Sequence, residues 1–275
     1  MHALRYVSAS GLVVEMDGPS TWAGTALDMR ANKWDYELGA RRLKRALRKA
    51  WTPEVEVYFG NSKDADVAAA IFDADVGAGI PGMFYANGCH QPGYCLGLVP
   101  LNLTRRGLKA KLQIALLDGV WRIPETYHLF PQSGDINGTK VYPLRYPYTY
   151  GSSLGVRYLN IGDMLPIAWK MVIYGYAVTP QLTIGGNVYQ FDVTVPDGGY
   201  LEVDTSPADP TVRLVTADGA SMDAFDCAQR GSGPGCGAYA FERISPGRKP
   251  VYWNDSFGTD LTVYHETGCP PNACD

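Results

Sequence analysis

The chain has 275 residues, of which 46% are hydrophobic and 19% charged, so a folded protein with a buried core is expected and global disorder is excluded. Its length suits one large or two ordinary domains. The net charge of −4 leaves no basic excess to neutralise phosphates, so no nucleic-acid partner is expected. There is no signal peptide and no apolar run that could span a bilayer, so we expect synthesis in a cytoplasm and no membrane partner.

The first ambiguous stretch is the basic run "RRLKRALRKAW" at 41–51. Leu43 and Leu47 have the spacing of one helix face, but the run also fits an edge strand leading into the alternating strand "EVEVYFG" at 54–60. Helix and strand both stay open at this point. The cations are either a solvated face or a partner surface, and as interface candidates they are Arg41, Arg42, Lys44, Arg45, Arg48 and Lys49.

A helix is predicted at about 61–77, "NSKDADVAAAIFDADVG". Asn61 or Ser62 can cap its first turn, where Asp64 also suits the helix dipole. Glycines at 77 and 79 end it. The apolar residues that recur at helical spacing are Val67, Ala70, Ile71 and Ala74.

Two motifs that resemble functional signatures fail in their context. The G-x-G-x-x-G at 77–82 closes a helix and precedes a strand, whereas a dinucleotide fingerprint follows a strand and opens a helix. The G-x-S-x-G around Ser153 lies between a linker and a strand, whereas a nucleophile elbow needs a strand before it and a helix after it. We therefore expect no enzyme activity, no catalytic residue and no cofactor.

The six cysteines form three close pairs in turn-rich segments, Cys89/Cys95, Cys227/Cys236 and Cys269/Cys274. Disulfides, free thiols and metal ligands all remain open. Cys89, His90 and Cys95 lack a second His/Cys cluster nearby, so no metal site is expected. We predict three local disulfides, within these pairs, once the protein has left a reducing cytoplasm.

A boundary is predicted in the Pro-rich stretch 131–153, and after it strands follow one another closely. In 168–205 the strands are separated by turns at Thr179-Pro180, Gly185-Gly186 and Asp197-Gly198, a spacing typical of a β-sandwich. The predicted organisation is an N-terminal β-domain at 1–135, an extended arm at 136–153 and a sandwich at 154–275. The aromatic residues of the sandwich are either core residues or a platform for sugars, and they include Tyr174, Tyr176, Tyr189, Tyr200, Trp253 and Tyr264.

The order of these elements resembles the distal tail (Dit) proteins of siphovirus-type phages, also described as minor tail or baseplate hub proteins. The resemblance rests on "SASGLVVEMDG", the charged stretch before "EVEVYFG", the helix "DADVAAAIFDADVGAGIPG", "FYANGCHQPGYCLG" and "LQIALLDGVWRIPE". In the second half it rests on "VTPQLTIGG", "FDVTVPDGGYLEVDT" and "ISPGRKPVYWND". It covers nearly the whole chain, and its motifs are strand-and-turn patterns. The terminal "GCPPNACD" is not accounted for by it.

The resemblance implies a mostly β fold, with one helix in the N-terminal domain and a galectin-like C-terminal sandwich. It implies that 41–51 is a strand and that the N-terminal domain closes a hexameric ring. Its implied partners are other copies of itself, the tail tube protein, the tape measure protein and the tail hub or tail-associated lysin. The implied location is the virion tail tip, after assembly in the host cytoplasm. The alternative function is a carbohydrate-binding module that recognises host wall sugars.

Overall fold

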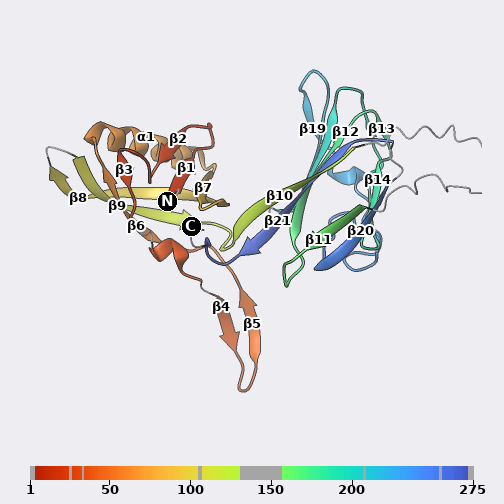
Figure 1. Ribbon diagram of the computed structural model, residues 1–275, viewed down its shortest axis with the longest axis horizontal. Coiled ribbons are helices and arrows are strands. Elements are labelled where there is room, and N and C mark those ends of the chain that lie inside the picture. Colours follow the sequence, from red (N-terminus) through yellow and green to blue (C-terminus); the bar gives the residue numbers. More distant parts are fainter. Residues whose placement is uncertain are drawn as a thin grey trace, which may run out of the picture. The chain divides into compact units, whose positions relative to one another are not determined.

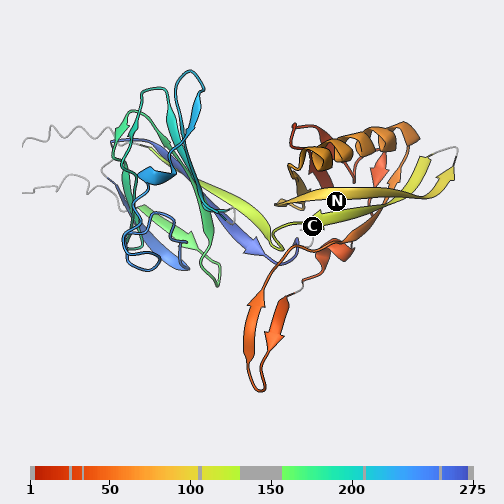
Figure 2. The ribbon, with the colours of Figure 1, turned by 180° about the vertical axis from the view of Figure 1, so that it is seen from behind.

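The computed structural model describes residues 4–24, 27–32, 34–104, 107–130, 157–206, 209–253 and 256–271 (Figures 1 and 2). It divides into two compact units, Met1–Ile123 with Glu266–Asp275, and Pro124–His265. The chain thus divides at 123/124 rather than at the predicted 135, and its last residues belong to the first unit rather than to the sandwich. The predicted arm at 136–153, including Ser153, lies outside the described residues.

Two strands, β10 (Trp121–Leu129) and β21 (Thr259–Thr267), run through the points at which the chain passes between the units. A strand that continues across a boundary has no Gly- or Pro-rich linker to mark it. For this reason the division is not visible in the composition of the sequence.

The first unit is built on one antiparallel sheet in the order β2–β1–β7–β8–β9–β6–β3. The bounds of these strands are β1 (Leu4–Val7), β2 (Val13–Glu15), β3 (Thr21–Trp22), β6 (Glu54–Phe59), β7 (Gly82–Ala86), β8 (Cys89–Thr104) and β9 (Gly107–Leu116). A short 3-10 helix, η1 (Leu27–Arg30), follows β3. Side chains of β6 and β9 alternate between buried and accessible, so the sheet has one core face and one open face.

The helix α1 (Ser62–Ala78) lies over the core face of this sheet, as Figures 1 and 2 show, and its predicted bounds are confirmed to within a residue. Asn61 is the N-cap, since its side chain accepts the backbone N–H of Lys63 at 3.1 Å. Gly79 closes the helix in the left-handed conformation, with φ of 67°. The glycines at 77–82 therefore end a helix, as the sequence predicted.

The buried face of α1 differs from the predicted one. Ala65, Ala68, Phe72 and Asp75 are buried, whereas Val67 is 60% exposed. Asp75 is buried because its carboxylate accepts the hydroxyl of Tyr6, on β1, at 2.5 Å. Because Asp75 is charged, a hydrophobicity pattern does not identify the helix face that contains it as the buried one.

The run at 41–51 contains a strand, so the ambiguity between helix and strand is resolved in favour of the strand. This strand, β5 (Leu43–Leu47), pairs with β4 (Asp35–Leu38) in a two-stranded hairpin.

The second unit consists of two main sheets with a common core. One has the order β19–β18–β17–β12–β21–β10, the other β11–β20–β14–β15, and β13 pairs with β16 in a small ladder. The bounds are β11 (Arg157–Ile161), β12 (Ala168–Tyr174), β13 (Ala177–Val178), β14 (Gln181–Ile184), β15 (Asn187–Gln190), β16 (Thr194–Val195), β17 (Tyr200–Asp204), β18 (Thr211–Val215), β19 (Ser221–Asp223), β20 (Gly247–Trp253) and the 3-10 helix η2 (Phe225–Cys227). The mostly β fold with one α-helix is confirmed.

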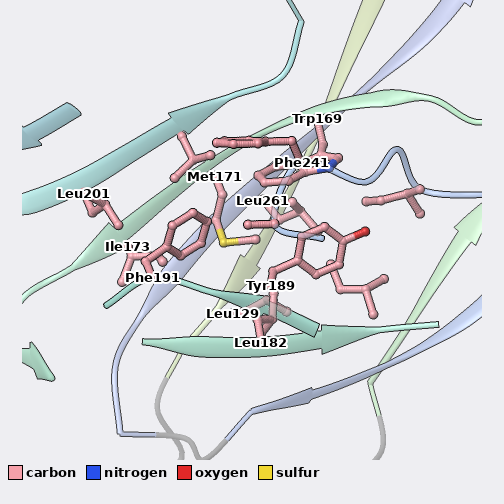
Figure 3. Close-up of a cluster of buried hydrophobic side chains, with 14 of the residues drawn as sticks. Leu129, Trp169, Met171, Ile173, Leu182, Tyr189, Phe191, Leu201, Phe241 and Leu261 are labelled. Atoms are coloured by element: carbon pink, nitrogen blue, oxygen red, sulfur yellow. The ribbon is translucent and has the colours of Figure 1, made fainter. Parts of the chain in front are cut away.

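The core of the second unit fills the space between its sheets (Figure 3). Trp169 and Met171 come from one sheet and Leu182 and Tyr189 from the other, and all four are almost completely buried. The rings of Trp169 and Tyr189 meet edge to face at 5.2 Å, and both side chains also donate hydrogen bonds to the carbonyl of Glu242. Polar ends that find partners allow these large rings to be buried.

Candidate functional site

The ladder β8–β9–β6 in the first unit has an unpaired edge on each side. Beyond Gly93, β8 pairs only with β9 among the described residues, so Leu96–Leu103 has no strand on its other side. On the other side, β3 pairs with β6 only at Tyr58 and Phe59, so Glu54–Val57 has no strand partner there within the described chain, although η1 lies against β6. We call these segments the β8 edge and the β6 edge. Unpaired strand edges are templates for the addition of another strand.

The β8 edge is also apolar on its surface. Leu96 is 54% exposed and Leu103 70%, and Val99 and Leu101 are exposed between them. Lone exposed leucines are ordinary, but a row of them along an open strand is typical of a surface that another protein covers.

The β4–β5 hairpin is a second exposed feature of the same unit, and Figure 1 shows it extending away from the sheet of that unit. Its strands pair only with each other among the described residues. Its apolar side chains are exposed, Tyr36 and Leu38 at 63% each and Leu43 at 57%. An isolated two-stranded hairpin is marginal in water, so these side chains need a partner to be buried.

The six basic interface candidates do not act alike. Lys44 pairs with Glu37 at 3.1 Å and Lys49 with Asp35 at 2.9 Å, so both brace the hairpin. Arg48 stacks on the ring of Trp34 at 4.4 Å.

Arg41 and Arg42 lie in the turn of the hairpin and Arg45 lies on β5. These three form no ion pair within the described part of the chain, so they are the cations left for an external acidic surface. Their role at an interface stays a prediction.

The open face of the first sheet is polar. Lys111 of β9 pairs with Glu54 of β6 at 2.9 Å, and Lys109 pairs with Glu56 at 2.7 Å. The hydrogen bond and charge of Lys109 lower the pKa of Glu56 below its usual value. Exposed ion pairs of this kind contribute little to the stability of the fold, but they make this face of the sheet suited to solvent while the other face is buried.

The predicted disulfide Cys89–Cys95 is wrong. Both cysteines lie on the continuous strand β8, six residues apart, which separates their Cα atoms by about 20 Å. A disulfide needs Cα atoms within about 7 Å. His90 points to the opposite face of the strand, so the three residues cannot converge on a metal either.

The remaining predicted pairs are not settled by the structure. Cys227 and Cys236 are both free thiols in the second unit, and Cys269 is a free thiol in the first. Cys274 lies outside the described residues. The pairings Cys227–Cys236 and Cys269–Cys274 stay predictions.

The aromatic residues considered as a sugar platform differ in exposure. Tyr189 and Tyr264 are buried, Tyr174 and Tyr176 are exposed, and Trp253 is covered by Arg157 at 4.6 Å. Tyr200 lies opposite Tyr174 on the neighbouring strand. Because two of the six are buried and one is covered, the six do not form one stacking surface.

The second unit has a hollow of about 420 Å³ beside β18 and β19, with Arg213, Asp223 and Phe225 in its lining. Phe225 stacks with Phe241 at 5.2 Å between ring centroids, and the guanidinium of Arg230 lies 4.4 Å from the Phe225 centroid. The ring is thus already engaged by two neighbours within the unit.

The sequence matches no protein-family model and no curated protein, but solved structures share its fold. A chain of the baseplate of phage p2, in its activated conformation with strontium, matches with a TM-score of 0.62 and 10% identity over 98% of this chain and 99% of that one. The same baseplate with calcium gives a TM-score of 0.60, again at 10% identity over 98% and 99%. The chain thus has the fold of a phage baseplate protein.

The Dit protein of phage SPP1 also matches, with a TM-score of 0.52 and 8% identity over 97% of this chain and 99% of that one. That protein is described as a paradigm of the hub adsorption apparatus in phages that infect Gram-positive bacteria. The fold is therefore Dit-like over nearly the whole chain, as the order of elements in the sequence implied.

Proposed function

We propose that this chain is a structural component of a phage tail tip, a ring that connects the tail tube to the hub and the host-binding apparatus. The observation that carries the proposal is the likeness to the p2 baseplate chain and to SPP1 Dit, which covers both units and nearly all of each protein. A likeness of this extent spans residues of both units rather than one alone.

The edges of the first unit supply a physical reason for a ring. The β8 edge and the β6 edge lie on opposite sides of one ladder, so the β8 edge of one copy can add to the β6 edge of the next. Such a contact is heterologous, and repeating it by a constant rotation closes a ring. Six copies of the 30.0 kDa chain give an assembly of about 180 kDa.

The β4–β5 hairpin supplies a second contact, made to a neighbouring copy or to the stacked tail tube. Arg41, Arg42 and Arg45 would face acidic groups there, in a chain whose net charge is negative. Exposed charge pairs are screened by salt, so this contact weakens as ionic strength rises.

The variant R41E/R42E should therefore assemble less well than the wild type at low salt. The variant K63E/K249E is the control, because it reverses two positive charges elsewhere on the chain.

The proposed partners are further copies of the chain, the tail tube protein, the tape measure protein and the hub or tail-associated lysin. Assembly would take place in the host cytoplasm and the mature location would be the tail tip of the virion. The role requires no chemical step, so we propose no enzyme activity.

Antibody labelling of purified tailed particles, combined with quantitative mass spectrometry, tests this function. Gold-labelled antibody against the chain should bind at the tail end far from the head, and the chain should be present at six copies per particle. Labelling along the tail or on side fibres, or a copy number that is not a multiple of six, would contradict the proposal.

Carbohydrate binding is the second candidate, and the hollow beside β18 and β19 is the feature in its favour. Arg213 and Asp223 supply polar groups of the kind that bind sugar hydroxyls, but the Phe225 ring already stacks with Phe241 and with Arg230. Binding of wall polysaccharide by the wild type, lost in R213A, would favour this candidate.

A further inference from the structure

The C-terminal segment after β21 returns to the first unit and lies beside the turn between β7 and β8. Asn87, in that turn, donates a hydrogen bond from Nδ2 to the carbonyl oxygen of Pro271 at 2.9 Å. Within the segment, the hydroxyl of Thr267 donates to the carbonyl of Cys269 at 3.0 Å. The two contacts fix the backbone at Cys269 and at Pro271.

The segment also passes close to Arg48. A Cβ placed on Gly268 would lie 2.2 Å from Nη1 of Arg48, so any larger residue here would displace the guanidinium. Arg48 is held in turn by the ring of Trp34. The C-terminal segment is thus seated against two separate parts of the first unit.

This seating brings two cysteines together. Cys89 is two residues beyond Asn87, and Cys269 is two residues before Pro271. The contact therefore brings the segment of Cys269 close to the segment of Cys89. Burial, and to a smaller extent the nearby Cys269, raise the pKa of the Cys89 thiol to about 11, so the two thiols lie within electrostatic reach.

We propose that Cys89 and Cys269 form a disulfide that fastens the C-terminal segment to the β7–β8 turn. The other described cysteines are less suited as partners of Cys89. Cys95 lies six residues further along the same strand, too far for a disulfide with Cys89. Cys227 and Cys236 belong to the second unit. The bond closes a loop that contains the whole second unit, and a long loop loses much conformational freedom when the unfolded chain is cross-linked.

The bond can form by exchange with a low-molecular-weight disulfide such as oxidised glutathione. Cys269 is partly exposed, so its thiolate attacks the reagent first and releases one molecule of thiol. The Cys89 thiolate then attacks the mixed disulfide and releases the second. Both cysteine protons end on the two released thiols, and the reagent takes both electrons. A reducing cytoplasm opposes this exchange, so the bond belongs to the mature extracellular protein.

Peptide mapping without reductant tests the proposal. The folded chain is incubated with oxidised glutathione, its free thiols are alkylated, and chymotrypsin is added. Cleavage after Tyr94 separates Cys89 from Cys95, and cleavage after Tyr264 releases the C-terminal peptide. The expected product is the Cys89 peptide joined to the C-terminal peptide, with fragmentation placing the link at Cys269. It should disappear after reduction.

Matched variants separate the two C-terminal cysteines. C274S should keep the link and C269S should lose it, while C236S serves as a control in the other unit. A link that survives in C269S, a wild-type map that contains only Cys269–Cys274, or alkylation of both Cys89 and Cys269 would overturn the proposal. The wild-type map decides the question even if a variant fails to fold. The proposal does not depend on the ring, so it can fail or hold independently of the tail-tip function.

Discussion

At the residue scale, the first unit is held together by a buried pair that joins its helix to its sheet. Asp75 of α1 accepts the hydroxyl of Tyr6 at 2.5 Å and the backbone N–H of Ala9 at 3.2 Å. Burial raises the pKa of Tyr6 above its ordinary value, and the hydrogen bond to Asp75 raises it further. The tyrosine therefore stays the donor at any physiological pH.

The variant Y6F keeps the buried ring and removes the donor. Asp75 then retains only the Ala9 N–H, and a buried acceptor that loses its partner costs about 1–3 kcal/mol. The free energy of unfolding of the first unit, measured by urea denaturation, should fall by that amount. Y85F, on the open face of the same sheet, is the control and should change little. Equal stability of Y6F and the wild type would show that the Tyr6–Asp75 bond does not contribute.

His265 is the corresponding polar centre of the second unit. Its Nδ1 lies 2.6 Å from Asp163 and its Nε2 lies 2.8 Å from Glu125, so a carboxylate faces each ring nitrogen. Burial lowers the pKa of His265, but the hydrogen bonds to Asp163 and Glu125 outweigh burial, so the pKa lies above 6.5. The hydrogen bonds from His265 and Tyr127 lower the pKa of Glu125 below 4.5.

These two shifts predict an optimum of stability in mild acid. The raised pKa of His265 contributes stability that is fully present below pH 6.5 and lost as pH rises through the folded-state pKa. The lowered pKa of Glu125 contributes stability that is present above pH 4.5 and lost as pH falls through its folded-state pKa. The melting temperature of the second unit should therefore be highest between these values.

The variant H265Q should lose the decline above pH 6.5, because it has no proton to release there. Melting curves of wild type and variant from pH 4 to pH 8 measure this, with H128Q as the control at a more exposed histidine. If H265Q declines with pH as steeply as the wild type, the His265 site is not the source of the dependence.

At the scale of elements, the sequence predicted correctly those features that depend on neighbouring residues, such as helix ends and hairpin turns. Asn61 and Gly79 marked the ends of α1, and the Gly185-Gly186 turn marked the β14–β15 hairpin. Signals that depend on distant residues failed. "CHQPGYC" reads as a loop because of Pro92 and Gly93, yet it is the first half of β8, held by β7 and β9 on either side. The proline and glycine are accommodated in a ladder that only the tertiary fold supplies.

The unpaired edges belong to this scale as well, and no pattern in the sequence identifies them. Which strands lack a neighbour depends on the order of strands in the sheet. Exposed Leu101 and Leu103 are the visible consequence, since apolar residues at these positions have no buried role in the single chain.

The variant L101K/L103K should keep the fold of the chain and weaken its assembly. Two ammonium groups on the β8 edge would have to lose water when a second strand is added, which is unfavourable. Sedimentation velocity over a range of concentrations should show at least a tenfold weaker self-association than wild type, a difference of about 1.4 kcal/mol. V67K/I80K, which places two lysines at other exposed apolar positions of the same unit, should associate like the wild type. Equal association of all three proteins would mean that the β8 edge is not an interface.

At the scale of the whole molecule, the order of the elements proved more informative than any motif. The composition excluded global disorder. The elements that flank the two enzyme-like motifs do not fit either motif, so neither indicated an enzyme. The functional hypothesis therefore rested on the resemblance to Dit proteins. The fold likeness over 97–98% of the chain supports that resemblance at identities of 8–10%. The division at 123/124 and the return of the last residues to the first unit were missed, because β10 and β21 are continuous strands.

The central claim is that copies of this chain close a ring at the tail tip, and an electron-microscopy reconstruction of intact tailed particles tests it most directly. The reconstruction, computed without imposed symmetry, should contain one ring of six copies between the tail tube and the tip. The first unit should be recognisable in each copy, with the β8 edge against the β6 edge of its neighbour. Isolated copies on side fibres, or copies found only inside the tail lumen, would contradict the claim.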